Sequence, residues 1–175
     1  MVTSGTIYLV PFSIEIDHLL LQLQDIIQQQ FKYHTRIKEQ HFDLSRYFNP
    51  DRVQYSANDI LAHLLELSVE NNDKIIGLTG VDIYIPVLTF IFGQAYLGGR
   101  AGVISDYRLK NEFYGMPNDQ ELFEQRLTKC IIHELGHMFG ILHCNRLDCV
   151  MRSATYVEEI DQKSIYLCQR CAQQL

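Results

Sequence analysis

The segment His133-Glu134-Leu135-Gly136-His137 places two imidazoles four residues apart. Residues at this spacing lie one turn apart on the same face of an α-helix, so both imidazoles can reach a single metal ion if the segment is helical. Gly140 follows, and a glycine can adopt the left-handed backbone conformation that ends a helix. The chain would turn there and bring His143 back towards the first two histidines. The pattern therefore predicts a helix, a turn and a three-histidine metal site.

Zinc suits this set of ligands, because it binds neutral imidazole nitrogens and keeps a fourth position for water when the protein supplies three ligands. Glu134 neighbours a ligand but points elsewhere on the helix, towards the open position, where its carboxylate can take a proton from the zinc-bound water. This arrangement is typical of metal-assisted amide hydrolysis. The alternative is that the histidines are ordinary surface or core residues, but the full HExxHxxGxxH pattern is specific.

Four cysteines in two close pairs indicate a second metal site. Cys144 and Cys149 follow the third histidine, and Cys168 and Cys171 come near the end of the sequence. Such paired spacing favours a closed, tetrahedral zinc site that contributes to folding and ties the C-terminal segment to the loop after the third histidine. A redox-active CxxC or two disulfides would explain fewer of the four positions. Cys130, the fifth cysteine, is expected to pack in the core.

The periodicity of apolar residues before the motif predicts alternating strands and helices. A strand over 6–10, a helix over 16–27 with a possible Ser13 cap, and a strand over 31–37 would form a βαβ unit with parallel strands. Further along, the pattern predicts a helix behind the box Ser56-Ala-Asn-Asp59, strands over 75–79, 90–97 and 102–105, and a helix from the box Asn118-Asp-Gln-Glu121 to Met138. This order of elements predicts an α/β fold.

Length and composition restrict the protein class. The chain has 175 residues, the size of one ordinary domain, and its 47% hydrophobic and 21% charged residues predict a folded core. A formal net charge of −6 argues against a nucleic-acid partner, and no apolar stretch is long enough to cross a membrane. The first basic residue is Lys32, so the start of the sequence lacks the charged segment of a secretory signal. We predict a cytoplasmic monomer in which stable disulfides do not form.

The combined motifs HELGHMFGILHC, Cys149-Val-Met151 and Cys168-x-x-Cys171 resemble those of the archaemetzincin family of zinc metallopeptidases. The similarity covers roughly residues 75–171, because matching residues also occur upstream: Gly77-Leu-Thr79, Asp82, Pro86, Phe92-Gly93, Gly99-Arg100 and Ser105. The resemblance implies a compact metzincin-like zincin domain with a twisted mixed β-sheet, helices and an active-site helix. It also implies that Met151 forms a methionine turn beneath the zinc, and that residues 90–97 form the cleft-edge strand that pairs with an extended substrate.

We therefore predict a single catalytic domain over residues 1–175, with sheet and helices in 1–117, the active-site helix in 118–140, and the third histidine, methionine turn and four-cysteine site in 141–175. It would hydrolyse peptide bonds in a peptide or protein substrate, using one catalytic and one structural Zn²⁺ and Glu134 as general base. Tyr156 is a candidate hydrogen-bond donor to the oxyanion, and Asp148 could orient a ligand imidazole. The alternatives are a zinc-stabilised scaffold with a closed histidine site, or a hydrolase of non-peptide amides. The sequence leaves the endo- or exopeptidase mode open.

Overall fold

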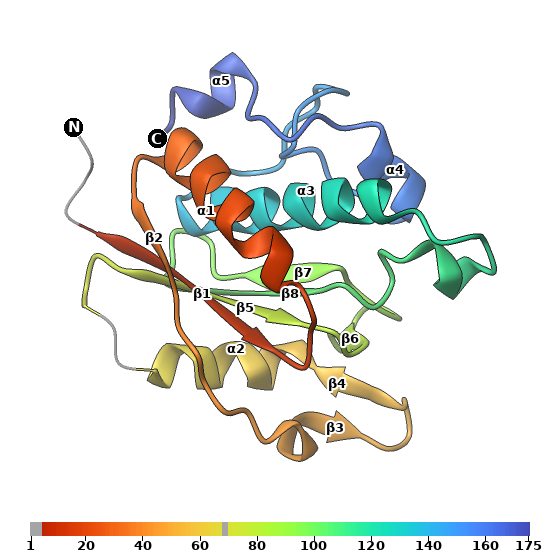
Figure 1. The fold of residues 1–175 in the computed structure, drawn as a ribbon. Helices are drawn as coiled ribbons and strands as arrows, with labels where there is room; N and C mark the ends of the chain where they lie inside the picture. Colours follow the sequence, from red (N-terminus) through yellow and green to blue (C-terminus); the bar gives the residue numbers. More distant parts are fainter. Residues whose placement is uncertain (1–4, 68–69) are drawn as a thin grey trace.

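A five-stranded mixed sheet lies at the centre of the fold, between helices (Figure 1). The computed structural model describes residues 5–67 and 70–175; the cytoplasmic prediction rests partly on residues 1–4, which lie outside the described residues. The strand order is β2 (His34–Ile37), β1 (Thr6–Phe12), β5 (Lys74–Thr79), β8 (Ala101–Ser105) and β7 (Gly93–Ala95), and only β7 runs antiparallel to its neighbour. A smaller sheet contains β3 (Phe48–Asn49), β4 (Gln54–Ser56) and β6 (Ile83–Tyr84).

Helices cover both faces of the central sheet. Figure 1 shows α1 (Asp17–Phe31) and α3 (Gln120–Met138) on one face and α2 (Ala57–Glu66) on the other. The shorter helices are α4 (Val157–Asp161), α5 (Gln169–Ala172) and the 3₁₀ turns η1 (Leu44–Tyr47) and η2 (Asn111–Tyr114). Within the ranges 5–67 and 70–175, no helix is long and apolar enough to cross a membrane.

The central strands are apolar on both faces, because each face packs against helices. Ile7 and Leu9 of β1 belong to the apolar cluster shared with α1 and α3, whereas Val10 and Phe12 belong to the cluster shared with α2. Strands that are buried on both faces are apolar along most of their length. This is why the first strand could be predicted from a short run of β-branched and aromatic residues.

The predicted βαβ unit is present, since β1 and β2 pair in parallel, but two details of the prediction are wrong. The N-cap of α1 is Ile16 rather than Ser13, which instead adopts a left-handed conformation with φ of 55°. Phe31 ends α1 and does not begin the second strand. Its ring stacks on Phe139, with 5.0 Å between centroids, and this tertiary contact extends the helix beyond its predicted end.

The two predicted capping boxes both mark helix starts. Ser56 accepts a hydrogen bond from the Asp59 backbone N–H at 3.4 Å and caps α2, as predicted. The cap of α3 is Asp119, one residue later than the predicted Asn118, and its carboxylate accepts from the Leu122 N–H at 3.0 Å. Each side chain supplies an acceptor for a backbone donor that has no partner inside the helix.

The strand predicted over residues 90–97 is much shorter in the structure. Only Gly93–Ala95 pairs with β8, so β7 is an edge strand of three residues. The chain turns at Gly98, which has φ of 64° and donates its N–H to the carbonyl of His137 at 2.8 Å. This hydrogen bond joins the end of the β7 segment to α3, the helix that carries the histidine pair.

Candidate active site and metal centres

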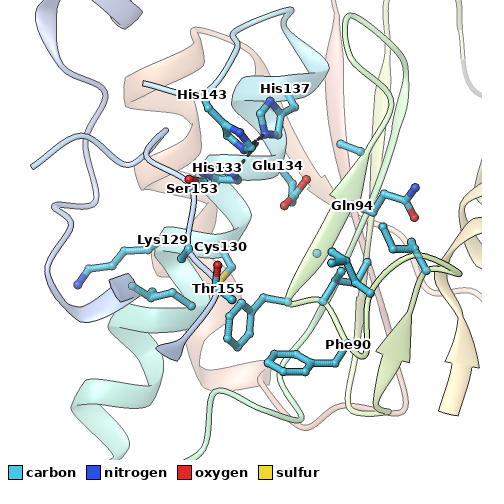
Figure 2. Close-up of a pocket in the computed structure, with 18 of the residues that line it drawn as sticks. Phe90, Gln94, Lys129, Cys130, His133, Glu134, His137, His143, Ser153 and Thr155 are labelled. Carbon is cyan, nitrogen blue, oxygen red and sulfur yellow. Dashed lines mark hydrogen bonds between the residues drawn. The ribbon is translucent and has the colours of Figure 1, made fainter. Parts of the chain in front are cut away.

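The structure brings the three predicted histidine ligands together (Figure 2). His133 and His137 lie on one face of α3, and the helix ends where Gly140 adopts φ of 87°, as the sequence predicts. The following loop returns His143 to the same place. The Nε2 atom of His137 lies 3.1 Å from that of His133 and 3.2 Å from that of His143.

The ring orientations fit a metal ion. The Nδ1 atoms of His133 and His137 each lie 2.8 Å from a backbone carbonyl, that of Val150 and that of Ile141 respectively. A nitrogen that faces a carbonyl must donate, so in the neutral rings the lone pair is on Nε2, where the three imidazoles converge. Tetrahedral zinc with bonds of about 2.0–2.1 Å holds its nitrogens about 3.4 Å apart, close to the observed separations.

Burial keeps these imidazoles neutral. It lowers the pKa of His133 to about 3, and it also lowers the pKa values of His137 and His143. The neutral form is the one that coordinates a metal. The expectation that Asp148 orients a ligand is not met, since backbone carbonyls bind the two Nδ1 atoms and Asp148 pairs with Arg146 at 3.0 Å.

Glu134 lies beside this cluster, with its carboxylate turned towards β7 (Figure 2). It is 7% exposed, and burial raises its pKa to about 8, against the opposing effect of the Lys163 charge. The side chain fits there because residue 93 is a glycine. A Cβ at Gly93 would lie 2.8 Å from the Glu134 Cγ, closer than carbon atoms pack. The prediction from sequence did not include this contact.

A cleft of about 390 Å³ opens beside the histidines and Glu134. Its walls come from α3, from residues 85–95 and from residues 153–163, and much of the lining is apolar, including Phe90, Phe92 and Ile160. Cys130 lines the cleft as a buried residue of the core, as predicted, and burial raises the pKa of its thiol to about 12. An apolar cleft with a few convergent polar groups is the usual form of a small-molecule or peptide site.

Met151 lies beneath the histidine pair. It is fully buried, and a Cβ at Gly136, between the two histidines of α3, would overlap its sulfur atom. The thioether therefore packs directly against the helix backbone. Tyr156 is 64% exposed and caps α4, immediately after Thr155 of the cleft wall. Met151 is placed where it could support the histidines from below, but its methionine-turn role and the oxyanion role of Tyr156 both stay predictions.

The four predicted cysteines form a second cluster, with all four sulfur atoms within 4.8 Å of one another. Cys144 and Cys168 are 3.9 Å apart at Sγ, and Cys149 and Cys171 are 3.8 Å apart. Tetrahedral zinc with bonds near 2.3 Å places its sulfurs about 3.8 Å apart, whereas a disulfide requires about 2.05 Å. The spacing fits a metal and not the two disulfides, and the cysteines in the described residues are free thiols.

Donors around the sulfur atoms support this fit. The backbone N–H of Cys168 reaches the Cys149 sulfur at 3.4 Å, and the Arg170 guanidinium reaches the Cys144 sulfur at 3.4 Å. Burial opposes ionisation of Cys144, but hydrogen bonds from the Arg146 backbone and from Arg170 lower its pKa to about 7. Groups that stabilise a thiolate favour metal binding, because the thiolate is the ligand.

Backbone hydrogen bonds tie the cysteine cluster to the histidine loop. Cys144, next to His143, donates its N–H to the carbonyl of Met151 at 3.0 Å. Val150, whose carbonyl binds His133, donates to the carbonyl of Tyr166 in the C-terminal segment at 3.2 Å. The C-terminal segment therefore braces the loop that positions the third histidine, as the sequence predicts.

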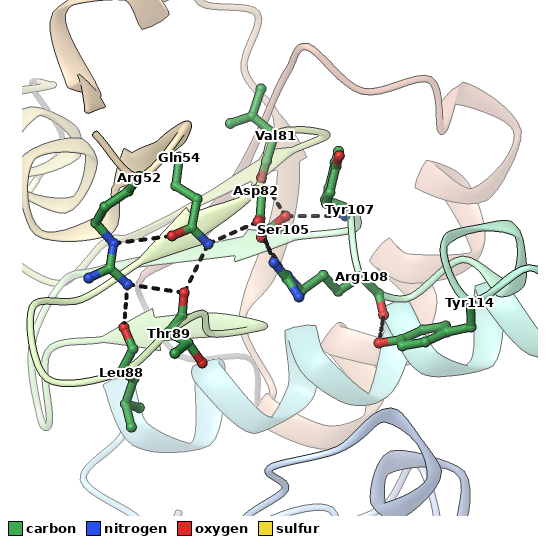
Figure 3. Close-up of polar contacts among 10 residues, drawn as sticks. All are labelled: Arg52, Gln54, Val81, Asp82, Leu88, Thr89, Ser105, Tyr107, Arg108 and Tyr114. Carbon is green, nitrogen blue, oxygen red and sulfur yellow. Dashed lines mark hydrogen bonds and ion pairs between the residues drawn. The ribbon is translucent and has the colours of Figure 1, made fainter. Parts of the chain in front are cut away.

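A polar network that sequence reasoning missed holds the opposite edge of the cleft (Figure 3); its side chains are Arg52, Gln54, Asp82 and Arg108. Arg52 donates to the carbonyls of Leu88–Thr89 at 2.7 and 3.1 Å. Gln54 bridges the Thr89 carbonyl and Asp82, each at 2.9 Å, and Arg108 makes two bonds of 2.7 Å to Asp82. The network therefore fixes the backbone immediately before residues 90–97.

Two imidazoles and a buried carboxylate on one helix, with a third imidazole returned by the following loop and an edge strand opposite, indicate the class: a zinc metallopeptidase. Comparison with known proteins gives the family. Residues 13–175 match the sequence profile of Peptidase family M54, and the chain belongs to this family. The resemblance to archaemetzincins that the motifs indicated is thereby confirmed.

Individual relatives agree. The archaemetzincin of Pyrococcus horikoshii is 40% identical over 129 residues, 73% of this chain and 69% of that protein. The crystal structure of archaemetzincin from Archaeoglobus fulgidus, complexed with malonate, is 31% identical, covers 97% of this chain and 99% of its own, and superposes with a TM-score of 0.81. The archaemetzincin structure from Methanopyrus kandleri is 32% identical, covers 96% of this chain and 91% of its own, and superposes with a TM-score of 0.84. The predicted mixed α/β fold is confirmed.

Proposed function

We propose that the protein hydrolyses peptide bonds in a peptide or protein substrate, with Glu134 as the general base and a catalytic zinc on His133, His137 and His143. The observation that carries this proposal is the position of the Glu134 carboxylate, buried beside the convergent imidazoles and lining the same cleft. Zinc in such a site lowers the pKa of a bound water and polarises a substrate carbonyl.

The chain's own groups supply the proton transfers. Glu134 takes the proton of the attacking water on a carboxylate oxygen, while the water oxygen bonds to the carbonyl carbon. The same carboxylate then passes the proton to the amide nitrogen as the C–N bond breaks, so a free amine and a carboxylic acid leave. Gly93 positions the base by leaving space for it. We retain Tyr156 as the candidate donor to the oxyanion and Met151 as the support beneath the imidazoles.

We assign the second zinc to Cys144, Cys149, Cys168 and Cys171, with a structural role. The cluster is mostly buried and does not line the cleft, so it offers no position to substrate. The hydrogen bonds that join it to the histidine loop make it a brace for the catalytic ligands. Removal of this zinc should therefore weaken the fold first and activity as a consequence.

The open cleft favours a peptidase over a scaffold with a closed histidine site. His143 is an exposed residue, and the cavity beside it has room for several substrate atoms. The hydrolysis of a non-peptide amide uses the same groups, so only the substrate distinguishes it from peptide cleavage.

The test is digestion of a diverse peptide library by wild type and by Glu134→Gln, each with its zinc content measured. We expect both proteins to hold two zinc ions per chain and only wild type to cleave, because removal of a general base lowers turnover about 10²- to 10⁴-fold. Cleavage by Glu134→Gln at the wild-type rate would contradict the mechanism. Failure of zinc-loaded wild type to cleave any peptide would favour the non-peptide amide or the scaffold.

A further inference from the structure

Lys163 is a cation of the cleft wall without a partner in the part of the chain that the structure describes. It follows α4, is 7% exposed and lines the cavity that holds the histidines and Glu134. Within residues 5–67 and 70–175, no hydrogen bond or ion pair reaches its Nζ atom. By contrast, the Nζ of Lys129, the other lysine of this wall, donates to the carbonyl of Asp161 at 3.1 Å.

The charge of Lys163 acts on the catalytic groups without pairing with them. Lys163 lines the same cavity as Glu134 and the three histidines. Its charge opposes the rise that burial causes in the pKa of Glu134, and it adds to the lowering of the histidine pKa values. The nearby carboxylate of Glu159 is already used, because it accepts the backbone N–H groups of Thr155 and Tyr156 at 2.6 and 3.1 Å. The charge of Arg152 also acts on Lys163, but it has the same sign and therefore cannot neutralise it.

The apolar surroundings of the Lys163 ammonium destabilise its charge when it is unpaired and strengthen any ion pair that it forms. Phe90, Phe92 and Ile160 line the cavity, and the Cys130 thiol is neutral at pH 7. A charge that is largely withdrawn from water requires a counter-charge, and a pair formed among apolar groups is stronger than one in solvent. A group that enters the cleft with the substrate can provide that counter-charge.

We propose that Lys163 binds a carboxylate of the substrate, so that the cleft selects peptides that place a negative charge near the scissile bond. The carboxylate comes from an Asp or Glu side chain or from the C-terminus of the peptide; both offer two oxygens to the three donors of the ammonium. This specificity rests on the proposed function, since it describes the substrate of the same site. It makes Lys163 a specificity-determining residue.

Cleavage of matched peptides tests the proposal. The best substrate from the library is synthesised with Glu or Gln at each of the three positions on either side of the cut, and with a free or amidated C-terminus. We expect one carboxylate to raise kcat/KM of wild type about 10- to 100-fold over its neutral counterpart, as a charged hydrogen bond does. The position at which the negative charge raises kcat/KM shows whether Lys163 binds an acidic side chain or the C-terminal carboxylate of the peptide. Equal rates for every charged and neutral pair would overturn the proposal.

Three variants assign the effect to this residue. Lys163→Met should lower kcat/KM for the carboxylate peptide about 10- to 100-fold more than for its neutral counterpart, whereas Lys163→Arg should keep the preference. Lys110→Met is the matched control, because it removes one positive charge from a lysine that pairs with Asp106 outside the cleft, and it should leave the preference unchanged. An equal loss for charged and neutral peptides in Lys163→Met would show a general or structural role instead.

A binding measurement separates this proposal from the proposed function. Zinc-loaded Glu134→Gln is titrated calorimetrically with acetyl-Glu-amide, acetyl-Gln-amide and acetyl-Ala with a free carboxylate, and the titrations are repeated with Lys163→Met added. Carboxylate binding that is lost with Lys163→Met supports the site even if wild type cleaves no peptide. Binding that does not change with Lys163→Met assigns the carboxylate to another group and contradicts the proposal.

Discussion

The substitution Gly93→Ala tests the position of the catalytic base without changing the base itself. The added Cβ would lie 2.8 Å from the Glu134 Cγ, 2.9 Å from its Oε1 and 3.0 Å from the carbonyl oxygen of Val103. Carbon atoms pack at about 3.7 Å, so Glu134 must move by about 0.9 Å. A displacement of about 1 Å in a catalytic group costs about 100-fold in rate, and we expect kcat to fall by about that factor.

The assay is steady-state cleavage of the best library peptide, with zinc content and thermal unfolding measured in parallel. Gly93→Ala should keep two zinc ions per chain and lose about 1–3 kcal/mol of stability through overpacking. Gly102→Ala is the control, because its Cβ would meet the Met138 sulfur at 3.0 Å rather than Glu134. It should lower stability but retain kcat. If Gly93→Ala turned over as fast as wild type, the tight contact could not be what positions Glu134.

Three further predictions concern the supporting structure. Elemental analysis of Cys171→Ser should find one zinc per chain. The free energy of unfolding should fall by on the order of 4 kcal/mol, which lowers Tm by roughly 8–16 °C; an unchanged Tm would argue against a structural metal. Arg52→Met should raise KM about 2- to 10-fold with zinc content unchanged, because the Leu88 carbonyl loses the Arg52 donor and the Thr89 carbonyl keeps only Gln54; an unaltered KM would mean that the cleft edge needs no such support. Arg126→Met leaves Asp161 without its two hydrogen bonds of 2.7 Å and should cost about 2–3 kcal/mol in urea unfolding, whereas a loss below about 0.5 kcal/mol would show that the pair contributes little.

The metal clusters were predictable because coordination fixes the spacing of ligands along the chain. His133 and His137 must be one helical turn apart, and Gly140 must permit the turn that returns His143; the structure has all three features. The two cysteine pairs follow the same logic across a longer loop. Local rules of helix formation and metal geometry were sufficient for these residues.

The cleft was less predictable, since it is made by contacts between distant residues. Arg52 and Arg108 are separated by more than 50 positions and are linked through Gln54 and Asp82. No sequence pattern marks such a network. The motifs included Gly93, but its contact with Glu134 depends on how β7 packs against α3, which periodicity does not report.

The errors in the predicted elements have a similar origin. Residues 90–97 are rich in aromatic and β-branched residues, yet only Gly93–Ala95 pairs with β8, while the side chains of Phe90 and Phe92 line the cleft. Helices α4 and α5, of five and four residues, are too short for helical periodicity to appear. Tertiary contacts decide structure where local preference is weak or divided.

The central claim is that the histidine and cysteine clusters each hold zinc, and anomalous diffraction at the zinc edge from crystals of an active preparation tests it most directly. We predict two peaks per chain, one among the Nε2 atoms of His133, His137 and His143 and one among the four sulfur atoms, with the first lost and the second retained in His143→Ala. Active crystals with no peak at the histidines would contradict the account.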